Sequence, residues 1–236
     1  MIDQSESAAL KYHNDTKHSF QSVRSDLHYL DFSNQPMPFK VYEEIEPIAL
    51  PPEPPRAMKN ALKSISSLRE EAGEKKPISL EILARIFFLA AGITKRIEVG
   101  GRSHYFRAAA CTGALYHIEL YLICGDSLSV GESGLPAGVY HLAVQDYSAR
   151  CLRQGDYRAT IVESLGRSDV PEAVFVYTST YWRNAWKYHS RTYRHCFWDS
   201  GTILANFLAA AASYDIDVRL NAGFKDNEVN ELLGLD

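Results

Sequence analysis

The stretch ISLEILARIFFLAAGI, residues 78–93, decides the fold class because it carries the clearest helix signal in the chain. Ser79 is predicted to cap the N-terminus of this helix, Glu81 falls in its first turn and Gly92 lies near its end. Apolar residues cover almost its whole circumference, which predicts a buried helix. Further along the chain, residues 201–216 (GTILANFLAAAASYDI) predict a second, largely buried helix.

Strand signals lie between these two helices. Residues 118–124 (IELYLIC), 138–144 (GVYHLAV) and 173–180 (AVFVYTST) are rich in β-branched and aromatic side chains, and we expect the last of them to be a central strand. This order of elements predicts an α+β fold, with a mixed, largely antiparallel sheet flanked by helices, rather than a doubly wound sheet. The chain contains neither GxGxxG nor GxxxxGK[ST], which argues against a dinucleotide fingerprint and a P-loop.

The first 55 residues have a different character. Residues 36–55 (PMPFKVYEEIEPIALPPEPP) place single apolar residues between prolines, which fix φ and remove backbone donors. We therefore predict an extended N-terminal arm over residues 1–55, followed by one domain over residues 56–236.

Composition excludes several classes of protein. A net charge of −4 over 236 residues argues against a nucleic-acid binder that relies on a global positive field. No run of about 18 apolar residues is present, so no membrane span is expected. The polar N-terminus is not expected to be a signal peptide. Four scattered cysteines without a CxxC pair predict reduced thiols in a cytoplasmic protein and no zinc site.

The stretch WKYHSRTYRHCFWDSG, residues 186–201, is dense in aromatic and basic side chains. Taken alone it could be a metal cluster, a nucleic-acid patch, an anion site at a helix start or an acid/base pair beside a cofactor. His189 and His195 are six residues apart, so they do not share a helix face, and we predict no metal site here. Asp199 is expected to be the N-cap of the following helix.

Six segments in order resemble the SagB-type dehydrogenase branch of the FMN-dependent nitroreductase superfamily, which includes azoline oxidases of thiazole/oxazole-modified peptide biosynthesis. They are YHNDTKHS (12–19), ISLEILARIFFLAAGIT (78–94), RAAACTGALYHIELYL (107–122), GLPAGVYHL (134–142), KYHSRTYRHCFWDSGTILANFLAAAA (187–212) and EVNELLGLD (228–236). The resemblance implies a nitroreductase fold, usually dimeric, with FMN held in a cleft between subunits.

The resemblance also implies a site. The family's catalytic pair matches Lys187 and Tyr188. Lys187 would remove a carbon-bound proton while hydride leaves to flavin, and neighbouring arginines such as Arg183 are expected to supply the positive potential that activates it. The family's flavin-contacting Pro-Ser-x-Gly turn corresponds to residues 110–113, Ala-Cys-Thr-Gly. The residues implied to bind the cofactor are Ser67, Arg69, Arg107, Cys111, Thr112, Gly113, Arg191 and Asn206.

The chain departs from the family pattern in three places. Residues 65–69 (ISSLR) keep Ser67 and Arg69 of an Arg-Arg-Ser-x-Arg-like phosphate segment but lack its two leading arginines. Cys111 replaces the turn serine. The sequence stops at LLGLD, where family members continue into a final strand, so the domain is expected to end before that strand.

Three hypotheses follow. The first is an FMN-dependent dehydrogenase of SagB type that acts on a peptide or small molecule as a homodimer or paired with a second nitroreductase-like domain. The second is a noncatalytic, flavin-poor subunit, or half of a tandem dimer, that serves docking or structure. The third is a single-strand nucleic-acid module built on the aromatic and basic residues of 181–194. The net charge disfavours the third.

Overall fold

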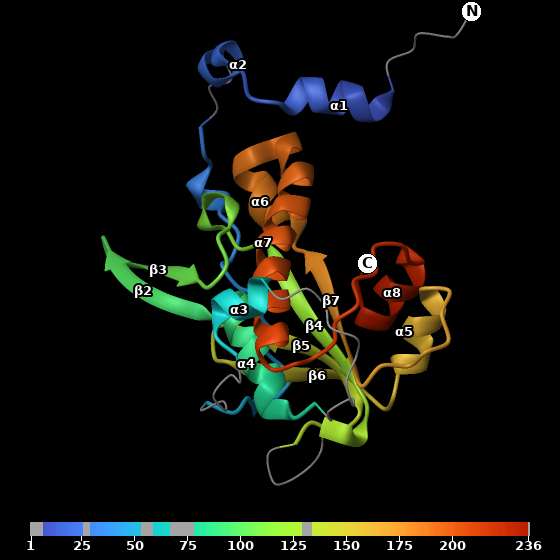
Figure 1. Ribbon diagram of the computed structural model, residues 1–236. Helices are drawn as coiled ribbons and strands as arrows, with labels where there is room; N and C mark the ends of the chain where they lie inside the picture. Colours follow the sequence, from blue (N-terminus) through green and yellow to red (C-terminus); the bar gives the residue numbers. More distant parts are fainter. Residues whose placement is uncertain (1–6, 26–28, 53–58, 67–77, 129–133, 236) are drawn as a thin grey trace, which may run out of the picture.

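A five-stranded antiparallel sheet forms the centre of the computed structural model (Figure 1), which describes residues 7–25, 29–52, 59–66, 78–128 and 134–235. The strand order is β1-β6-β5-β4-β7, and every neighbouring pair is antiparallel. The strands are β1 (Pro47–Ala49), β4 (Ile118–Cys124), β5 (Gly138–Ala143), β6 (Ser148–Gln154) and β7 (Ala173–Ser179). The predicted α+β class is confirmed.

The edge position of β7 corrects the prediction that this segment is a central strand. β7 pairs only with β4 among the described strands, from Ile118 opposite Ser179 to Cys124 opposite Ala173. All residues of β4 are buried, whereas those of β7 are only partly buried. An apolar run signals burial against a helix layer, but it does not reveal how many strands pair with it.

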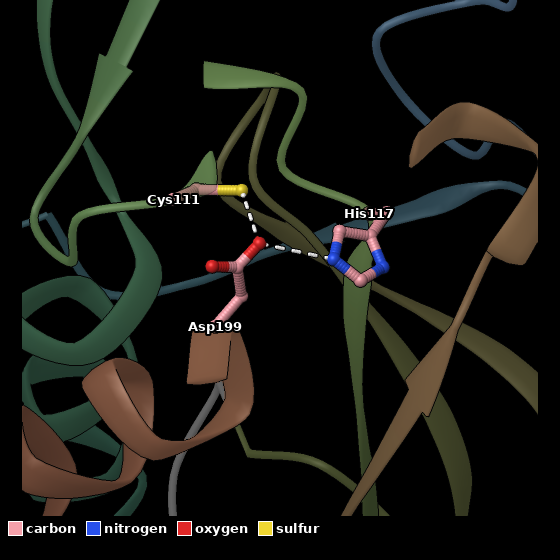
Figure 2. A group of neighbouring side chains, drawn as sticks. All are labelled: Cys111, His117 and Asp199. Carbon is pink, nitrogen blue, oxygen red and sulfur yellow. Dashed lines mark hydrogen bonds and ion pairs between the residues drawn. The ribbon is translucent and has the colours of Figure 1, made fainter. Parts of the chain in front are cut away.

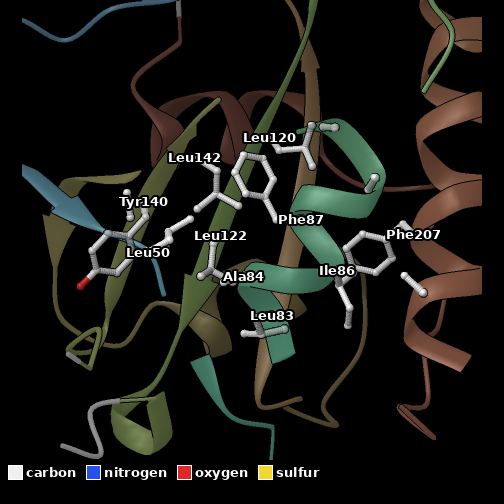
Figure 3. Close-up of a cluster of buried hydrophobic side chains, with 14 of the residues drawn as sticks. Leu50, Leu83, Ala84, Ile86, Phe87, Leu120, Leu122, Tyr140, Leu142 and Phe207 are labelled. Carbon is white, nitrogen blue, oxygen red and sulfur yellow. The ribbon is translucent and has the colours of Figure 1, made fainter. Parts of the chain in front are cut away.

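One face of the sheet is covered by α4 (Leu80–Ala91) and α7 (Thr192–Ser213), and the short α3 (Ala61–Ser66) packs against α7. Figure 3 shows the ring of Phe87 beside Leu120 and Leu142 of the sheet, and Phe207 of α7 on the side of α4 that carries Ile86. Ser79 accepts a hydrogen bond from the Ile82 amide, and Gly92 follows the last helical residue, so the predicted caps of α4 are confirmed. The contacts of α4 and α7 with the sheet form the larger part of the core.

The opposite face carries α5 (Arg158–Ser164) and α8 (Asp226–Leu233). Val229 and Leu232 of α8 pack with Ile161 of α5 against Tyr121 and Ile123 of β4. Alternate residues of β4 therefore enter two different helix layers, which is the period-2 pattern of a strand buried on both sides.

The N-terminal arm contains two helices that the sequence analysis did not predict, α1 (Ala8–Thr16) and α2 (Phe20–Ser25), and a 3₁₀ turn, η1 (Phe32–Asn34). Residues 35–46 then run without helix or strand, as the prolines predict, and β1 joins the sheet at its other edge. The indole of Trp186 donates to the Asp31 carbonyl, and Lys40 Nζ lies 2.7 Å from the Tyr121 hydroxyl. The arm is thus anchored to the body.

The remaining described elements lie around this frame. A hairpin of β2 (Ile93–Val99) and β3 (Arg102–Arg107) projects from the body (Figure 1). The 3₁₀ turns are η2 (Thr112–Ala114), η3 (Asp126–Leu128) and η4 (His189–Arg191), and α6 (Tyr181–Tyr188) precedes α7. Within the described residues, no helix combines the length and apolar character needed to cross a membrane.

Candidate functional site

The carboxylate of Asp199 is the centre of a buried polar cluster. It accepts hydrogen bonds from the Thr112 amide at 3.0 Å, the Thr112 hydroxyl at 2.8 Å and the Cys111 thiol at 3.1 Å, and its Oδ2 lies 3.0 Å from His117 Nε2 (Figure 2). Asp199 is 4% exposed. These contacts join α7 to the turn that precedes β4.

The predicted N-cap role of Asp199 is wrong. The helix begins at Thr192, so Asp199 lies inside α7 rather than before it. Its side chain turns away from the helix backbone toward residues 111–117 because four polar groups there need an acceptor.

Hydrogen bonding and burial act in opposite directions on this cluster. Burial works to raise the pKa of the Asp199 carboxyl, but hydrogen bonds from His117, Cys111 and Thr112 outweigh it and hold the pKa below the usual value. Burial, and then the Asp199 carboxylate, raise the pKa of the Cys111 thiol to about 12. Cys111 is therefore a neutral donor at pH 7, and Asp199 is the charged acceptor.

The turn after Cys111 has an unusual backbone. Gly113, Ala114 and Tyr116 all have positive φ, of 66°, 53° and 47°. Such conformations persist only where surrounding contacts hold them, and they concentrate at functional sites. Here the Tyr116 amide donates to Cys111 Sγ at 3.0 Å and Asp199 holds Thr112, so the cluster fixes the strained turn.

Tyr188 lies directly against this turn. A methyl group added to Gly113 would overlap with the Tyr188 hydroxyl. The structure therefore brings the turn that the resemblance implies to contact flavin together with one member of the predicted catalytic pair. The pair itself lies at the C-terminal end of α6.

Lys187 is half buried and makes no hydrogen bond or ion pair with any residue that the structure describes. Its Nζ lies 5.3 Å from the centroid of the Tyr188 ring. Arg183 does not supply the positive potential that was expected to activate Lys187, because its guanidinium pairs with Glu119 at 2.6 Å. Arg191 donates instead to the Thr16 carbonyl in the arm.

Arg107 is a buried cation beside the turn. It lines a hollow of about 10 Å³ together with Cys111, Tyr116 and Asp199, and its Nε has no hydrogen-bond partner among the described residues. Burial lowers the pKa of its guanidinium to about 10, although nearby Glu119 works against this. A buried cation without a hydrogen-bond acceptor suits an anionic or electron-rich ligand.

Two of the predicted cofactor residues have positions that do not join this cluster. Asn206 donates to the Leu89 carbonyl and so fastens α7 to α4. Arg191 donates to the Thr16 carbonyl and so holds the N-terminal arm. Ser67 and Arg69 lie outside the described residues. Cys111, Thr112, Gly113 and Arg107, by contrast, come together around Asp199.

Two functional candidates were not predicted. They are His117 and Ser179. His117 Nδ1 lies 2.8 Å from Ser179 Oγ, so the imidazole bridges Ser179 and Asp199. The sequence signal for this site was a histidine placed just before a mostly apolar strand.

Gly113→Ala should destabilise the protein and displace Tyr188. A left-handed backbone costs about 1–2 kcal/mol for a residue with a Cβ, and the overlap with the Tyr188 hydroxyl adds to this. Urea unfolding measures the loss, and Tyr188→Phe in the same chain should recover part of it. Gly201→Ala is the matched control, because Gly201 lies in α7 with open space around it and should gain up to about 1 kcal/mol. Equal losses in both variants would contradict the contact.

The Nitroreductase family model matches residues 74–236, and the chain belongs to the Nitroreductase family. The trifolitoxin-processing protein TfxB of Rhizobium leguminosarum bv. trifolii is 26% identical over 181 residues, which cover 73% of this chain and 48% of TfxB. The microcin B17-processing protein McbC of Escherichia coli is 29% identical over 130 residues, 52% of this chain and 47% of McbC. The chain therefore spans about half the length of these relatives.

Solved structures agree on the fold. A nitroreductase-like protein from Anabaena variabilis superposes with a TM-score of 0.74 at 27% identity over 97% of this chain and 43% of that one. A chain of the E. coli microcin synthetase McbBCD complex, with truncated pro-MccB17 bound, gives a TM-score of 0.59 at 18% identity over 97% of this chain and 86% of that one. The predicted nitroreductase-type fold is confirmed.

Proposed function

We propose that the chain is an FMN-dependent oxidoreductase of SagB type that dehydrogenates a substrate such as a peptide azoline to an azole. The observation that carries this proposal is the contact between Tyr188 and Gly113, which joins the expected catalytic pair to the expected flavin turn. The names of TfxB, a trifolitoxin-processing protein, and McbC, a microcin B17-processing protein, support a peptide substrate.

The residues beside the turn fit an electron-rich ring. Arg107 has a buried Nε without a hydrogen-bond partner among the described residues, and it can donate to the carbonyl edge of a flavin. Bound FMN supplies the hydride acceptor. The residues expected to grip its phosphate, Ser67 and Arg69, lie outside the described residues.

The chain's own side chains have separate roles in this proposal. The Lys187 amine, which no described acid neutralises, takes the carbon-bound proton of the substrate. The Tyr188 hydroxyl orients the substrate by hydrogen bonding where it meets the turn. Asp199 touches neither, and it positions the turn by holding Thr112 and Cys111.

The alternative is a noncatalytic, flavin-poor subunit, and one observation favours it. Backbone donors of the turn that could face a flavin are already engaged, because the Thr112 amide donates to Asp199 and the Ala114 amide donates to the Cys111 carbonyl. The absence of the two leading arginines from residues 65–69 points the same way.

The proposed active form pairs this domain with a second copy or a second nitroreductase-like domain. Tyr193, Phe197 and Leu208 lie on one face of α7 and are 55%, 63% and 39% exposed. Relatives about twice as long are consistent with a second domain that covers this face. All four cysteines are free thiols, which supports the proposed cytoplasmic location.

Flavin uptake tests the proposal. The purified chain should be yellow or become so when FMN is added, and Arg107→Met should weaken FMN affinity about tenfold or more, since hydrogen bonds to charged groups contribute roughly 1.5–3 kcal/mol. Fluorescence titration of FMN measures this, with Lys225→Met, a change to an exposed lysine, as the control. A colourless protein that does not bind added FMN would contradict the enzymatic proposal and favour the noncatalytic one.

A further inference from the structure

Three atoms of metal-ligating types meet at the start of β4. Cys111 Sγ, His117 Nε2 and Asp199 Oδ2 all lie within 4.8 Å of one another (Figure 2). We propose that Cys111, His117 and Asp199 form a binding site for one divalent transition-metal ion of the zinc type. This goes beyond the flavin proposal, and it reverses the expectation of no metal site, which considered only His189, His195 and cysteine spacing along the sequence.

The ligand spacing is close to what such an ion needs. Tetrahedral zinc with thiolate, imidazole and carboxylate ligands at about 2.0–2.3 Å places neighbouring ligand atoms about 3.3–3.7 Å apart. Here Oδ2 lies 3.1 Å from Sγ and 3.0 Å from Nε2. Side-chain shifts of a few tenths of an ångström open these two separations to the required values, and the third pair, Sγ and Nε2, lies within 4.8 Å. The three ligands belong to different elements: the turn, the residue before β4, and α7.

The histidine and the carboxylate of this site each have a supporting hydrogen-bond partner. His117 Nδ1 lies 2.8 Å from Ser179 Oγ, and an Nδ1–H donated to this hydroxyl leaves Nε2 unprotonated for the ion. Asp199 Oδ1 is held by the amide and hydroxyl of Thr112, so Oδ2 remains directed at Cys111 and His117. Fixed second partners of this kind orient ligands in metal sites.

Charge and space also suit an ion. Binding displaces the Cys111 thiol proton to solvent, so the hydrogen bond from Sγ to Asp199 is replaced by two bonds to the metal. Thiolate and carboxylate together balance two positive charges. The hollow of about 10 Å³ beside Cys111 and Asp199 has room for about one water as a fourth ligand. Arg107 lines this hollow, and its positive charge favours a hydroxide as the fourth ligand.

Cobalt binding tests this site separately from flavin. We expect the purified, reduced chain to take up one Co²⁺ and to develop the thiolate-to-cobalt charge-transfer band and the visible bands of a tetrahedral site, with Zn²⁺ displacing the colour. Cys111→Ser should remove the charge-transfer band but fold normally, because a serine hydroxyl can still donate to Asp199. Ser179→Ala should keep the band and weaken Co²⁺ affinity about 10–100-fold.

Cys151→Ser is the matched control, because it removes another half-buried thiol, in β6, away from the three ligands. It should bind Co²⁺ as the unchanged chain does. A charge-transfer band that survives Cys111→Ser, or that disappears in Cys151→Ser, would overturn the assignment, as would an unchanged chain that shows no such band. Repeating the titration with and without FMN keeps a failure of flavin binding distinct from a failure of the metal site.

Discussion

Glu119→Leu is expected to lower the free energy of unfolding by about 3–5 kcal/mol, because it leaves Arg183 as a buried cation without its carboxylate. Glu119 and Arg183 are 4% and 2% exposed, and their charged atoms lie 2.6 Å apart. His141 adds a second contact to Glu119 at 3.2 Å. Burial works to raise the pKa of Glu119, but His141 and Arg183 outweigh it and hold the pKa below the usual value.

A second variant distinguishes charge compensation from simple packing. In Glu119→Leu/Arg183→Leu both charges are gone, so the double variant should be more stable than Glu119→Leu alone. Urea unfolding followed by circular dichroism measures the double variant and both single variants, Glu119→Leu and Arg183→Leu. Glu228→Gln is the control, since its pair with Lys225 is exposed and should contribute less than about 1 kcal/mol. A double variant that loses the sum of the single losses would show that Glu119 and Arg183 do not compensate each other.

The same cluster fastens the arm to the domain. Arg183 Nε donates to the Met37 carbonyl at 2.9 Å, and its Nη1 donates to the Tyr116 carbonyl at 2.8 Å. One guanidinium therefore connects the arm, the turn before β4 and the sheet. Arg183 was expected to act on Lys187, which lies four residues further along the same helix and therefore on the same face. The guanidinium is instead taken up by Glu119 and by the carbonyls of Met37 and Tyr116, contacts that the local sequence does not reveal.

Local rules predicted the parts of the fold that local forces determine. Ser79 and Gly92 delimit α4 because a hydroxyl cap and a terminal glycine act within one turn. The edge position of β7 was not predictable in this way, because strand order depends on pairing between segments far apart in sequence. The helices of the arm were missed for a similar reason: Tyr12 donates to the Ser190 carbonyl in η4, and Arg194 near the start of α7 donates to the Thr16 hydroxyl.

In the candidate site, too, some features were predicted from the sequence and others depend on contacts between distant segments. Its turn and catalytic pair were predicted through a family resemblance, and the structure places Gly113 against Tyr188. Asp199 was misassigned because an aspartate before an apolar run usually caps a helix. The acceptor demand of Cys111, Thr112 and His117, which are distant in sequence, outweighs that local preference. Nothing in the spacing of these residues indicates that they meet.

The second large effect is expected at Lys187. In the proposed oxidation, Lys187→Ala removes the group that takes the substrate proton, and loss of a positioned base typically costs about 10²–10⁴-fold in rate. The FMN content should not change, because Lys187 is not among the residues that line the hollow at the turn. The measurement is kcat/KM of the FMN-loaded protein on a synthetic thiazoline peptide, followed by the mass loss of one hydrogen molecule.

Two controls decide what a loss at Lys187 means. Lys225→Ala, at an exposed lysine before α8, should keep full activity. Tyr188→Phe removes only the hydroxyl that meets Gly113, so it should lose less activity than Lys187→Ala and keep the fold. The noncatalytic alternative makes the opposite prediction in cells. There, Lys187→Ala would leave the modified peptide product unchanged, while deletion of the whole chain would abolish it, because a docking subunit needs its surface and not its amine.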